Sequence, residues 1–214
     1  MFKRSSPTRA YNDKMSKTTS GLHNVTKEQI PSTAWRLLQG GRETARDPLH
    51  TPVLATSGNF GPSQRTVVLR HVDPSLRILA CHTDLRSLKV REACDNQPSS
   101  WLFYDRERKL QIRLAGLSSV HSDDHLAELR WSETNPHGKA CYNSNHAPGQ
   151  EVSAPLSAPA PINGTGTEAL ARARFAVLAT RIEFLDWLVL SSKGHRRAQF
   201  VWKEGNWSGS WVAP

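Results

Sequence analysis

The chain has 214 residues, of which 37% are hydrophobic and 22% are charged. This composition supplies enough apolar surface for the core of a single domain, and it excludes a wholly disordered chain. No segment approaches the roughly 18 apolar residues of a membrane helix. No apolar stretch follows the first residues as it does in a secretory signal, so the sequence predicts neither a membrane span nor secretion.

The charge is unevenly distributed: the chain carries 28 Lys and Arg against 19 Asp and Glu, a net +9. Residues 1–20 contain five basic residues and one Asp, a net +4, without hydrophobic periodicity, so we expect a disordered basic tail before a single domain over 21–214. The remaining +5 suits anionic ligands such as phosphates. Nucleic acid is the rival partner, but no basic stripe with interleaved aromatic residues supports it, and we predict no nucleic-acid partner.

The three cysteines, Cys81, Cys94 and Cys141, are far apart and form no Cys-x-x-Cys motif. Without a secretory signal, they indicate reduced thiols and a cytoplasmic protein. His121 and His125 have the spacing of two metal ligands on a helix, but the residues between them have the pattern of a helix start. The sequence therefore predicts no metal site.

The predicted elements begin with a helix over 32–46, where Trp35, Leu37 and Leu38 have helical spacing and Gly40-Gly41 forms a stop signal. Short β-like runs follow at 51–56, 65–72 and 76–82, and after a short helix over 85–94 further strands are expected at 100–104 and 110–120. The turns between these runs predict an antiparallel meander.

The second half begins with a helix that starts at Ser122–Asp124 and turns Leu126, Leu129 and Trp131 inward. Residues 148–166 contain four Pro and three Gly, which indicates a long loop inserted in the domain. Strands are expected at 175–190, 194–202 and 207–212, the last two as a hairpin. Many short strands with few helices predict a β-barrel flanked by helices, and the absence of G-x-G-x-x-G disfavours a Rossmann sheet.

Two basic segments, Arg65–Arg70 and Thr83–Lys89, have the pattern of an anion site. Arg65 and Arg70 are five residues apart on a strand, so they emerge on opposite faces and only one can serve a given pocket directly. Ser87 stands at an expected helix start, where free backbone N–H groups and the helix dipole favour a phosphate. A solvated basic face with a Ser N-cap is the alternative that composition leaves open.

The sequence resembles the FMN-binding split barrels of the pyridoxamine 5'-phosphate oxidase type. The motifs that carry the resemblance are Arg65–Arg70 (the family's R-x-V-x-L-[RK]), His82-Thr83, Arg86-Ser87-x-Lys89, Gln111 within Leu110–Gly116, and a terminal block with Trp187, His195-Arg196-Arg197, Trp207 and Pro214. They span about 35–149 and 175–214. The resemblance implies a mainly β fold, a six-stranded antiparallel split β-barrel with flanking helices, which binds FMN at the interface of a homodimer.

The resemblance also implies residue roles. FMN would be bound by Arg65, Val67, Val68, His82, Thr83, Arg86, Ser87, Lys89 and Gln111, and by Trp187 and Arg197 of the other subunit, while Arg70, Lys193 and His195 would face the substrate. Considered without the family, Gln111 could bond a backbone carbonyl, Trp187 could be a core residue and His195 could lie in an exposed turn.

Two departures concern the substrate. The family's Tyr-x-x-x-Arg-x-x-x-Ser stretch, which grips the substrate phosphate, has no counterpart in 131–139, and Lys193 replaces the Arg of its Arg-x-His motif. The implied function is an FMN-dependent oxidoreductase that moves a hydride from an amine or alcohol carbon of a small phosphorylated substrate to FMN, with O2 as acceptor. The alternative is an FMN-binding or haem-binding split barrel without vitamin B6 oxidase activity.

Overall fold

The computed structural model describes residues 21–214, so the predicted tail over 1–20 lies outside the described residues. The helices are α2 (Ile30–Glu43), α3 (Leu88–Asp95), α4 (His125–Glu133), α5 (Pro136–Ala140) and α6 (Thr165–Arg174), with 3-10 turns η1 (Lys27–Gln29) and η2 (Pro48–His50). The strands are β1 (Val53–Gly58), β2 (Gly61–Thr66), β3 (His71–Asp73), β4 (Ile78–Asp84), β5 (Pro98–Asp105), β6 (Leu110–His121), β7 (Phe175–Val189), β8 (Arg196–Lys203) and β9 (Asn206–Val212). None of these helices is long and apolar enough to cross a membrane.

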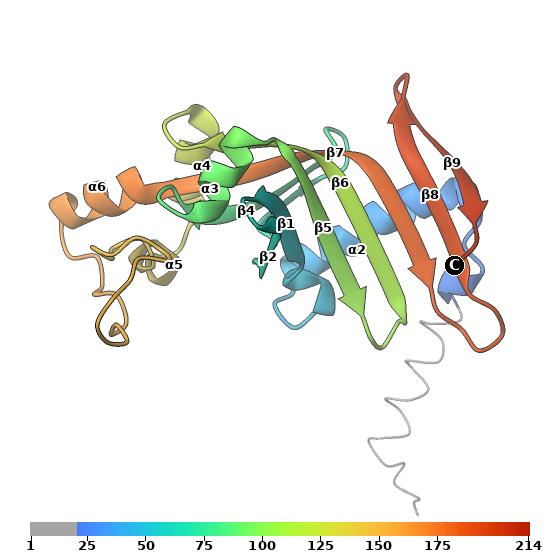
Figure 1. The fold of residues 1–214 in the computed structure, drawn as a ribbon, viewed down its shortest axis with the longest axis horizontal. Helices are drawn as coiled ribbons and strands as arrows, with labels where there is room; N and C mark the ends of the chain where they lie inside the picture. Colours follow the sequence, from blue (N-terminus) through green and yellow to red (C-terminus); the bar gives the residue numbers. More distant parts are fainter. Residues whose placement is uncertain (1–20) are drawn as a thin grey trace, which may run out of the picture.

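The nine described strands form one antiparallel sheet, with β7 as its longest member (Figure 1). The order is β2-β1-β5-β6-β7-β4-β3, and β8 and β9 continue the sheet from the other half of β7. β7 pairs with β4 through Phe175–Arg181 and with β8 through Phe184–Val189, so the sheet divides where β7 changes partner. The prediction of a mainly β, antiparallel fold with flanking helices is confirmed. The sheet is not closed, and its strands outnumber the six that the resemblance implied.

The extra strands arise partly because the expected strand over 65–72 is divided in two. After β2 ends, the amides of Val67 and Leu69 bond to the carbonyls of Pro52 and His50, whereas the amide of Arg70 bonds to Ala80 on β4. The segment therefore passes from the β1 side of the sheet to the β4 side. Leu69 and Val72 are both buried although they are three residues apart, so the period of two is interrupted where the segment changes sides. The sequence pattern looked like one strand because no turn residue marks this change.

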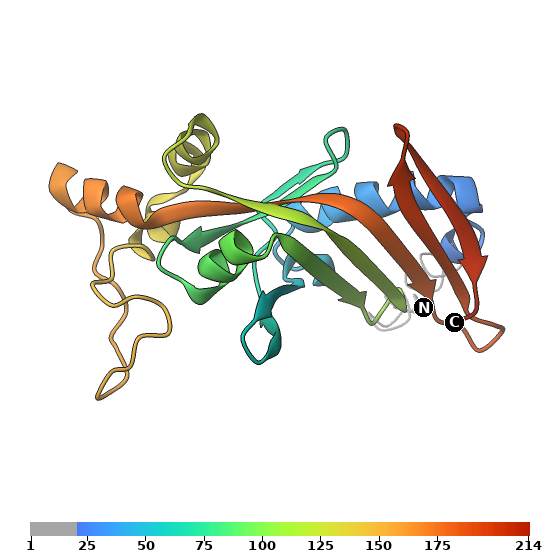
Figure 2. The same cartoon turned by 45° about the horizontal axis from the view of Figure 1, so that its top comes forward.

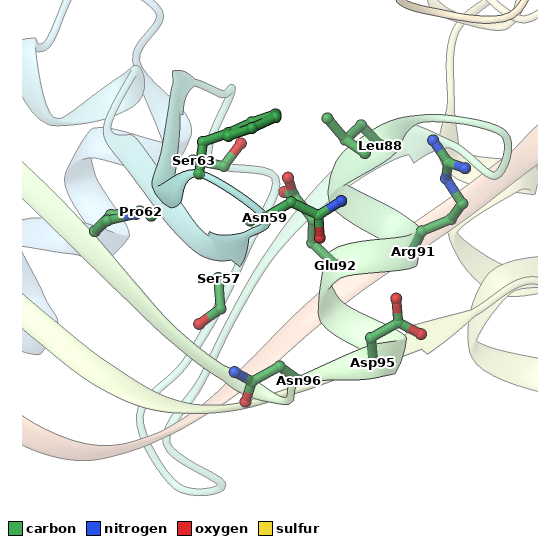
Figure 3. Close-up of a pocket in the computed structure, with 12 residues that line it drawn as sticks. Ser57, Asn59, Pro62, Ser63, Leu88, Arg91, Glu92, Asp95 and Asn96 are labelled. Carbon is green, nitrogen blue, oxygen red and sulfur yellow. The ribbon is translucent and has the colours of Figure 1, made fainter.

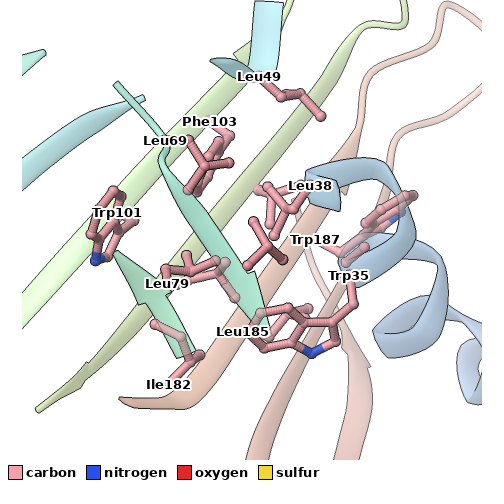
Figure 4. Close-up of a cluster of buried hydrophobic side chains, with 14 of the residues drawn as sticks. Trp35, Leu38, Leu49, Leu69, Leu79, Trp101, Phe103, Ile182, Leu185 and Trp187 are labelled. Atoms are coloured by element: carbon pink, nitrogen blue, oxygen red, sulfur yellow. The ribbon is translucent and has the colours of Figure 1, made fainter. Parts of the chain in front are cut away.

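Helices cover the sheet at both ends, as Figure 2 shows: α2 lies along the half that carries β8, while α3, α4 and α6 lie toward the other end of β7. Trp35 and Leu38 of α2 pack into the main core, which Figure 4 shows with Leu69, Leu79, Trp101, Phe103, Ile182, Leu185 and Trp187. A smaller cluster around Trp131 and Phe175 lies under α4 and α6. Burial of these rings supplies the main driving force for folding.

Local details of the helices differ from the sequence expectations. α2 begins at Ile30 with Pro31 in its first turn, two residues before the expected start at 32, and continues through Gly40 and Gly41. A Cβ on Gly41 would lie 2.8 Å from Leu49, so this glycine serves close packing and not a helix end. In α4, Ala127 and Trp131 are buried while Leu129 is 40% exposed, against the expected inward face.

A bulge between Ala115 and Gly116 bends β6 against β7. A side chain at Gly116 would collide with the backbone carbonyl of Arg181, so only glycine fits. The bend lets the two longest strands curve together around the core.

Candidate functional site

Three residues between the end of β4 and the first turn of α3 form what we term the Lys89 cluster: Thr83, Ser87 and Lys89. The ammonium of Lys89 donates to the hydroxyl of Thr83 at 2.9 Å and to that of Ser87 at 3.2 Å, and the two hydroxyls lie 3.0 Å apart. Ser87 is the N-cap of α3, but its side chain makes no capping hydrogen bond. The free amides of the first turn therefore remain available to an anion.

The Lys89 ammonium is partly buried. Burial, followed by the nearby Arg65 charge, lowers the pKa of Lys89. Within residues 21–214 the ammonium forms no ion pair, and its hydrogen-bond partners are neutral hydroxyls. A partly buried cation is costly unless it is paired, so an anion such as a phosphate fits this cluster.

Arg65 lies beside this cluster but already has an acidic partner. Its guanidinium donates to Glu92 at 2.9 Å and to the hydroxyls of Thr56 and Ser63 at 2.5 Å each. Burial acts to raise the pKa of Glu92, but hydrogen bonds from Thr56, Ser63 and Arg65 outweigh it and hold the pKa below its usual value. Arg65 therefore braces β2 against α3 and adds positive potential next to Lys89.

A cavity of about 560 Å³ opens next to Arg65, between the β1–β2 hairpin and α3 (Figure 3). Ser63 and Glu92, both partners of Arg65, line it. Phe60 at the hairpin tip is fully exposed and Leu88 is 51% exposed, so the cavity has an apolar rim. This volume is in the range of small-molecule and cofactor sites.

Arg86, which the resemblance assigned to the cofactor phosphate, has a different set of partners. Its guanidinium forms a fork with Asp84 at 2.9 and 2.7 Å and donates to the carbonyls of Ser144 and His146. It fastens the loop after α5 to the end of β4. Its hydrogen bonds do not reach the Lys89 cluster.

The strand register places Gln111 and Arg197 in one row across the sheet, in which Gln111 faces Leu188 and Leu188 faces Arg197. Gln111 also pairs with Tyr104 of β5, a strand in which exposed residues such as Tyr104 alternate with buried ones. We call the face of the sheet that carries Tyr104, Gln111 and Arg197 the outer face. Arg65 pairs with the buried Leu54 and therefore lies on the inner face, opposite to Gln111 and Arg197.

Trp187 requires a correction. It is 1% exposed and packs in the main core, on the inner face of β7. A side chain enclosed by the core of its own chain cannot reach a flavin of another subunit. The core alternative holds for this residue, because the period of two along β7 turns Trp187 inward and its neighbour Asp186 outward.

A second cavity, of about 360 Å³, contains Arg70, which was expected to face the substrate. We call it the Arg70 pocket; its walls include His82, Arg130, Thr134 and Gly138. Arg130 was not predicted. No motif pointed to it, because residues 130, 134 and 138 have the spacing of the family's phosphate grip but not its residue type at any of the three positions.

His82 lies at the wall of the Arg70 pocket, and its Nε2 is buried without a hydrogen-bond partner within the described residues. Burial, followed by the charges of Arg70 and Arg130, lowers its pKa to about 4. The imidazole is therefore neutral at pH 7. An unsatisfied buried nitrogen of this kind is available to a bound polar group.

Other predicted residues lie apart from both cavities. Lys193 and His195 occupy the exposed turn between β7 and β8, where Nδ1 of His195 accepts from the amide of Ser191 at 3.1 Å. The Val67 amide bonds to Pro52, so it is not free for a cofactor. Val68, the next residue, is half-buried in the segment that leads to Arg70.

The histidine pair that was considered for metal binding does not converge. His121 bonds through Nδ1 to Asp124 at 2.5 Å, and Asp124 caps α4 by accepting from the Ala127 amide. In the part of the chain that the structure describes, no three His, Cys, Asp or Glu side chains group as metal ligands.

Comparison with known proteins identifies the class. Residues 33–122 match the family described as pyridoxamine 5'-phosphate oxidase, FMN-binding domain. A pyridoxamine 5'-phosphate oxidase-related FMN-binding protein from Nostoc punctiforme is 19% identical with a TM-score of 0.66, over 85% of this chain and 96% of its own. PhzG from Burkholderia lata, solved with tetrahydrophenazine-1-carboxylic acid, is 20% identical with a TM-score of 0.65, over 90% of this chain and 95% of its own. No curated protein matches the chain.

The chain thus has the fold of the FMN-binding proteins related to pyridoxamine 5'-phosphate oxidase, and the match of residues 33–122 confirms the resemblance predicted from the sequence. The matched domain is FMN-binding, which also confirms the predicted cofactor.

The depressed pKa of His82 predicts a pH-dependent stability. The folded protein keeps His82 neutral down to about pH 4, whereas an unfolded chain protonates it near its ordinary value of 6.5. Between these values the unfolded state binds more protons, so stability falls as pH falls, by at most about 3 kcal/mol. In urea titrations at pH 7, 5.5 and 4.5, His82→Gln should lose less stability than the parent protein. Parallel losses in both proteins would contradict the assignment.

Proposed function

We propose that this protein is an FMN-dependent oxidoreductase that binds the FMN phosphate at the Lys89 cluster and a small phosphorylated substrate in the Arg70 pocket. The observation that carries the proposal is the partly buried Lys89 ammonium, which has two hydroxyls and a free helix start around it and forms no ion pair within residues 21–214. The match of 33–122 to an FMN-binding domain supports the same ligand.

FMN, when bound, would supply the redox chemistry by taking a hydride from an amine or alcohol carbon and passing the two electrons to O2, which leaves as peroxide. The residues of this chain have simpler tasks. Lys89 and the first-turn amides of α3 would bind the cofactor phosphate. Arg70 and Arg130 would neutralise the anionic group of the substrate. The neutral His82 would form a hydrogen bond to the same group without adding charge.

We also propose a homodimer, because the two groups of cofactor residues lie on opposite faces of one sheet. FMN held at the Lys89 cluster cannot also meet Gln111 or Arg197 of the same chain by a direct path. The outer face of a second copy would supply them. That face also exposes four large hydrophobic residues, Leu102, Tyr104, Leu117 and Val201, which a partner would cover.

A second candidate function is FMN binding without vitamin B6 oxidation. Thr134 and Gly138 stand where the spacing of the phosphate grip requires Arg and Ser, and Arg130 already pairs with Glu133 at 2.7 Å. The pocket thus keeps positive charge but lacks much of the grip that the family motif provides.

The cofactor site is tested by Lys89→Met, with Lys203→Met at an exposed strand end as the matched control. The parent protein should purify yellow and release FMN on denaturation. Loss of one hydrogen-bonded charge should weaken FMN binding by about ten- to hundredfold. Fluorescence titration of the apoprotein with FMN measures this. A colourless parent protein that takes up no added FMN would refute the proposed function.

Mixed subunits test the shared site. Arg65→Ala damages the inner-face side and Arg197→Ala the outer-face side, so each homodimer should bind FMN poorly. A heterodimer of the two has one site with both sides intact, and mixing should restore part of the FMN binding. A protein that binds FMN tightly as a monomer in solution scattering would exclude the shared site.

The altered grip predicts weak oxidation of pyridoxamine and pyridoxine 5'-phosphate. Two missing contacts of about 2 kcal/mol each correspond to roughly a thousandfold lower kcat/KM. Steady-state peroxide assays beside a true B6 oxidase measure the difference. A value within tenfold of that enzyme would show that Arg70 and Arg130 replace the missing residues.

A further inference from the structure

Asp186 has an unusual place in the sheet. It points to the outer face from β7, the strand at the centre of the β6–β7–β8 region (Figure 1), yet its side chain is only 1% exposed. Among residues 21–214, the side chains that bond to the carboxylate are those of Arg113, Arg197 and Gln199. Arg113 on β6 and Gln199 on β8 are its register partners, and Arg197 reaches it from the position opposite Leu188.

The contacts of Asp186 are directional. Arg197 donates from Nε at 3.0 Å and from one terminal nitrogen at 2.7 Å, which is a two-point fork. Gln199 donates at 3.1 Å, and Arg113 approaches at 3.4 Å. Burial acts to raise the pKa of Asp186, but these hydrogen bonds and the two guanidinium charges outweigh it, so the pKa lies below its usual value.

The fork fixes one rotamer of Arg197 and uses only part of its hydrogen-bonding capacity. A guanidinium has five N–H groups in a rigid plane, and two of its three nitrogens bond to Asp186 here. The remaining donors stay on the outer face, on which Gln111 also lies. Arg113, which is 52% exposed, pairs with the same carboxylate as Arg197. Two guanidinium groups therefore share one carboxylate, and the cluster keeps a net positive charge.

We propose that Asp186 is a positioning residue for the cofactor: it holds the Arg197 guanidinium in the orientation that meets the FMN of a second subunit. The inference rests on the proposed function, because it assumes that FMN binds between two copies. It adds a residue that the family motifs quoted above do not contain. Without Asp186, Arg197 would keep its charge but would have to be ordered on binding, at a cost in side-chain entropy.

The test compares Asp186→Asn with Asp105→Asn as the matched control. Asp105 is also 1% exposed and pairs with an arginine, Arg108, at 3.1 Å, but it lies at the end of β5. Both variants should lose stability in urea. Asp186→Asn should in addition raise the Kd for FMN by about tenfold, the scale expected when an ordered arginine is released, whereas Asp105→Asn should leave it unchanged.

A double-mutant cycle separates positioning from general damage. In an Arg197→Ala background, Asp186→Asn should have no further effect on the FMN Kd, because the side chain that it positions is gone. If the two effects add in full, or if Asp186→Asn binds FMN like the parent protein, Asp186 is only structural and the inference is wrong. If the parent protein itself binds no FMN, the proposed function fails, and this inference with it.

Discussion

The sharing of strand β7 between two partners is the constraint on which the rest of the molecule depends. Its first half pairs with β4 and its second half with β8, while β6 follows it along nearly its whole length. One end of the sheet therefore carries the Lys89 cluster beside β4, and the other carries Arg197 on β8. The period of two along β7 then assigns Trp187 to the core and Asp186 to the outer face.

Charge is handled differently on the two faces. On the inner side, Arg65 is paired with Glu92, whereas Lys89 has only hydroxyl partners. On the outer side, one carboxylate serves two guanidinium groups. Both arrangements leave positive charge that the folded chain does not neutralise, and such charge is stabilised when an anion or a partner arrives. The Arg65–Glu92 ion pair holds β2 against α3. The basic groups whose charge is not balanced, Lys89 and the Arg113–Arg197 pair, mark where we propose that ligands bind.

The opposition of the two faces is the reason why we propose that cofactor binding depends on assembly. Arg65 lies on one side of the sheet and Gln111 on the other, so in the proposed site they would belong to two half-sites on opposite faces of one molecule. Two copies related by symmetry would complete two sites at once and would cover the apolar outer face. FMN affinity and dimer stability should then depend on each other.

The sequence by itself determined most of the local structure and the class of protein. Apolar, β-like runs between turn signals located β6 and β7 closely, and the motifs at Arg65–Arg70 and Arg86–Lys89 indicated the FMN-binding family, because such runs and motif spacings are properties of neighbouring residues. Only the tertiary structure decided that 65–72 is divided, that Trp187 is a core residue, and that Arg130 joins Arg70. It also brought Asp186 to Arg113 and Arg197. These outcomes depend on pairing between residues far apart in the chain, and no local pattern encodes which strand will lie beside which.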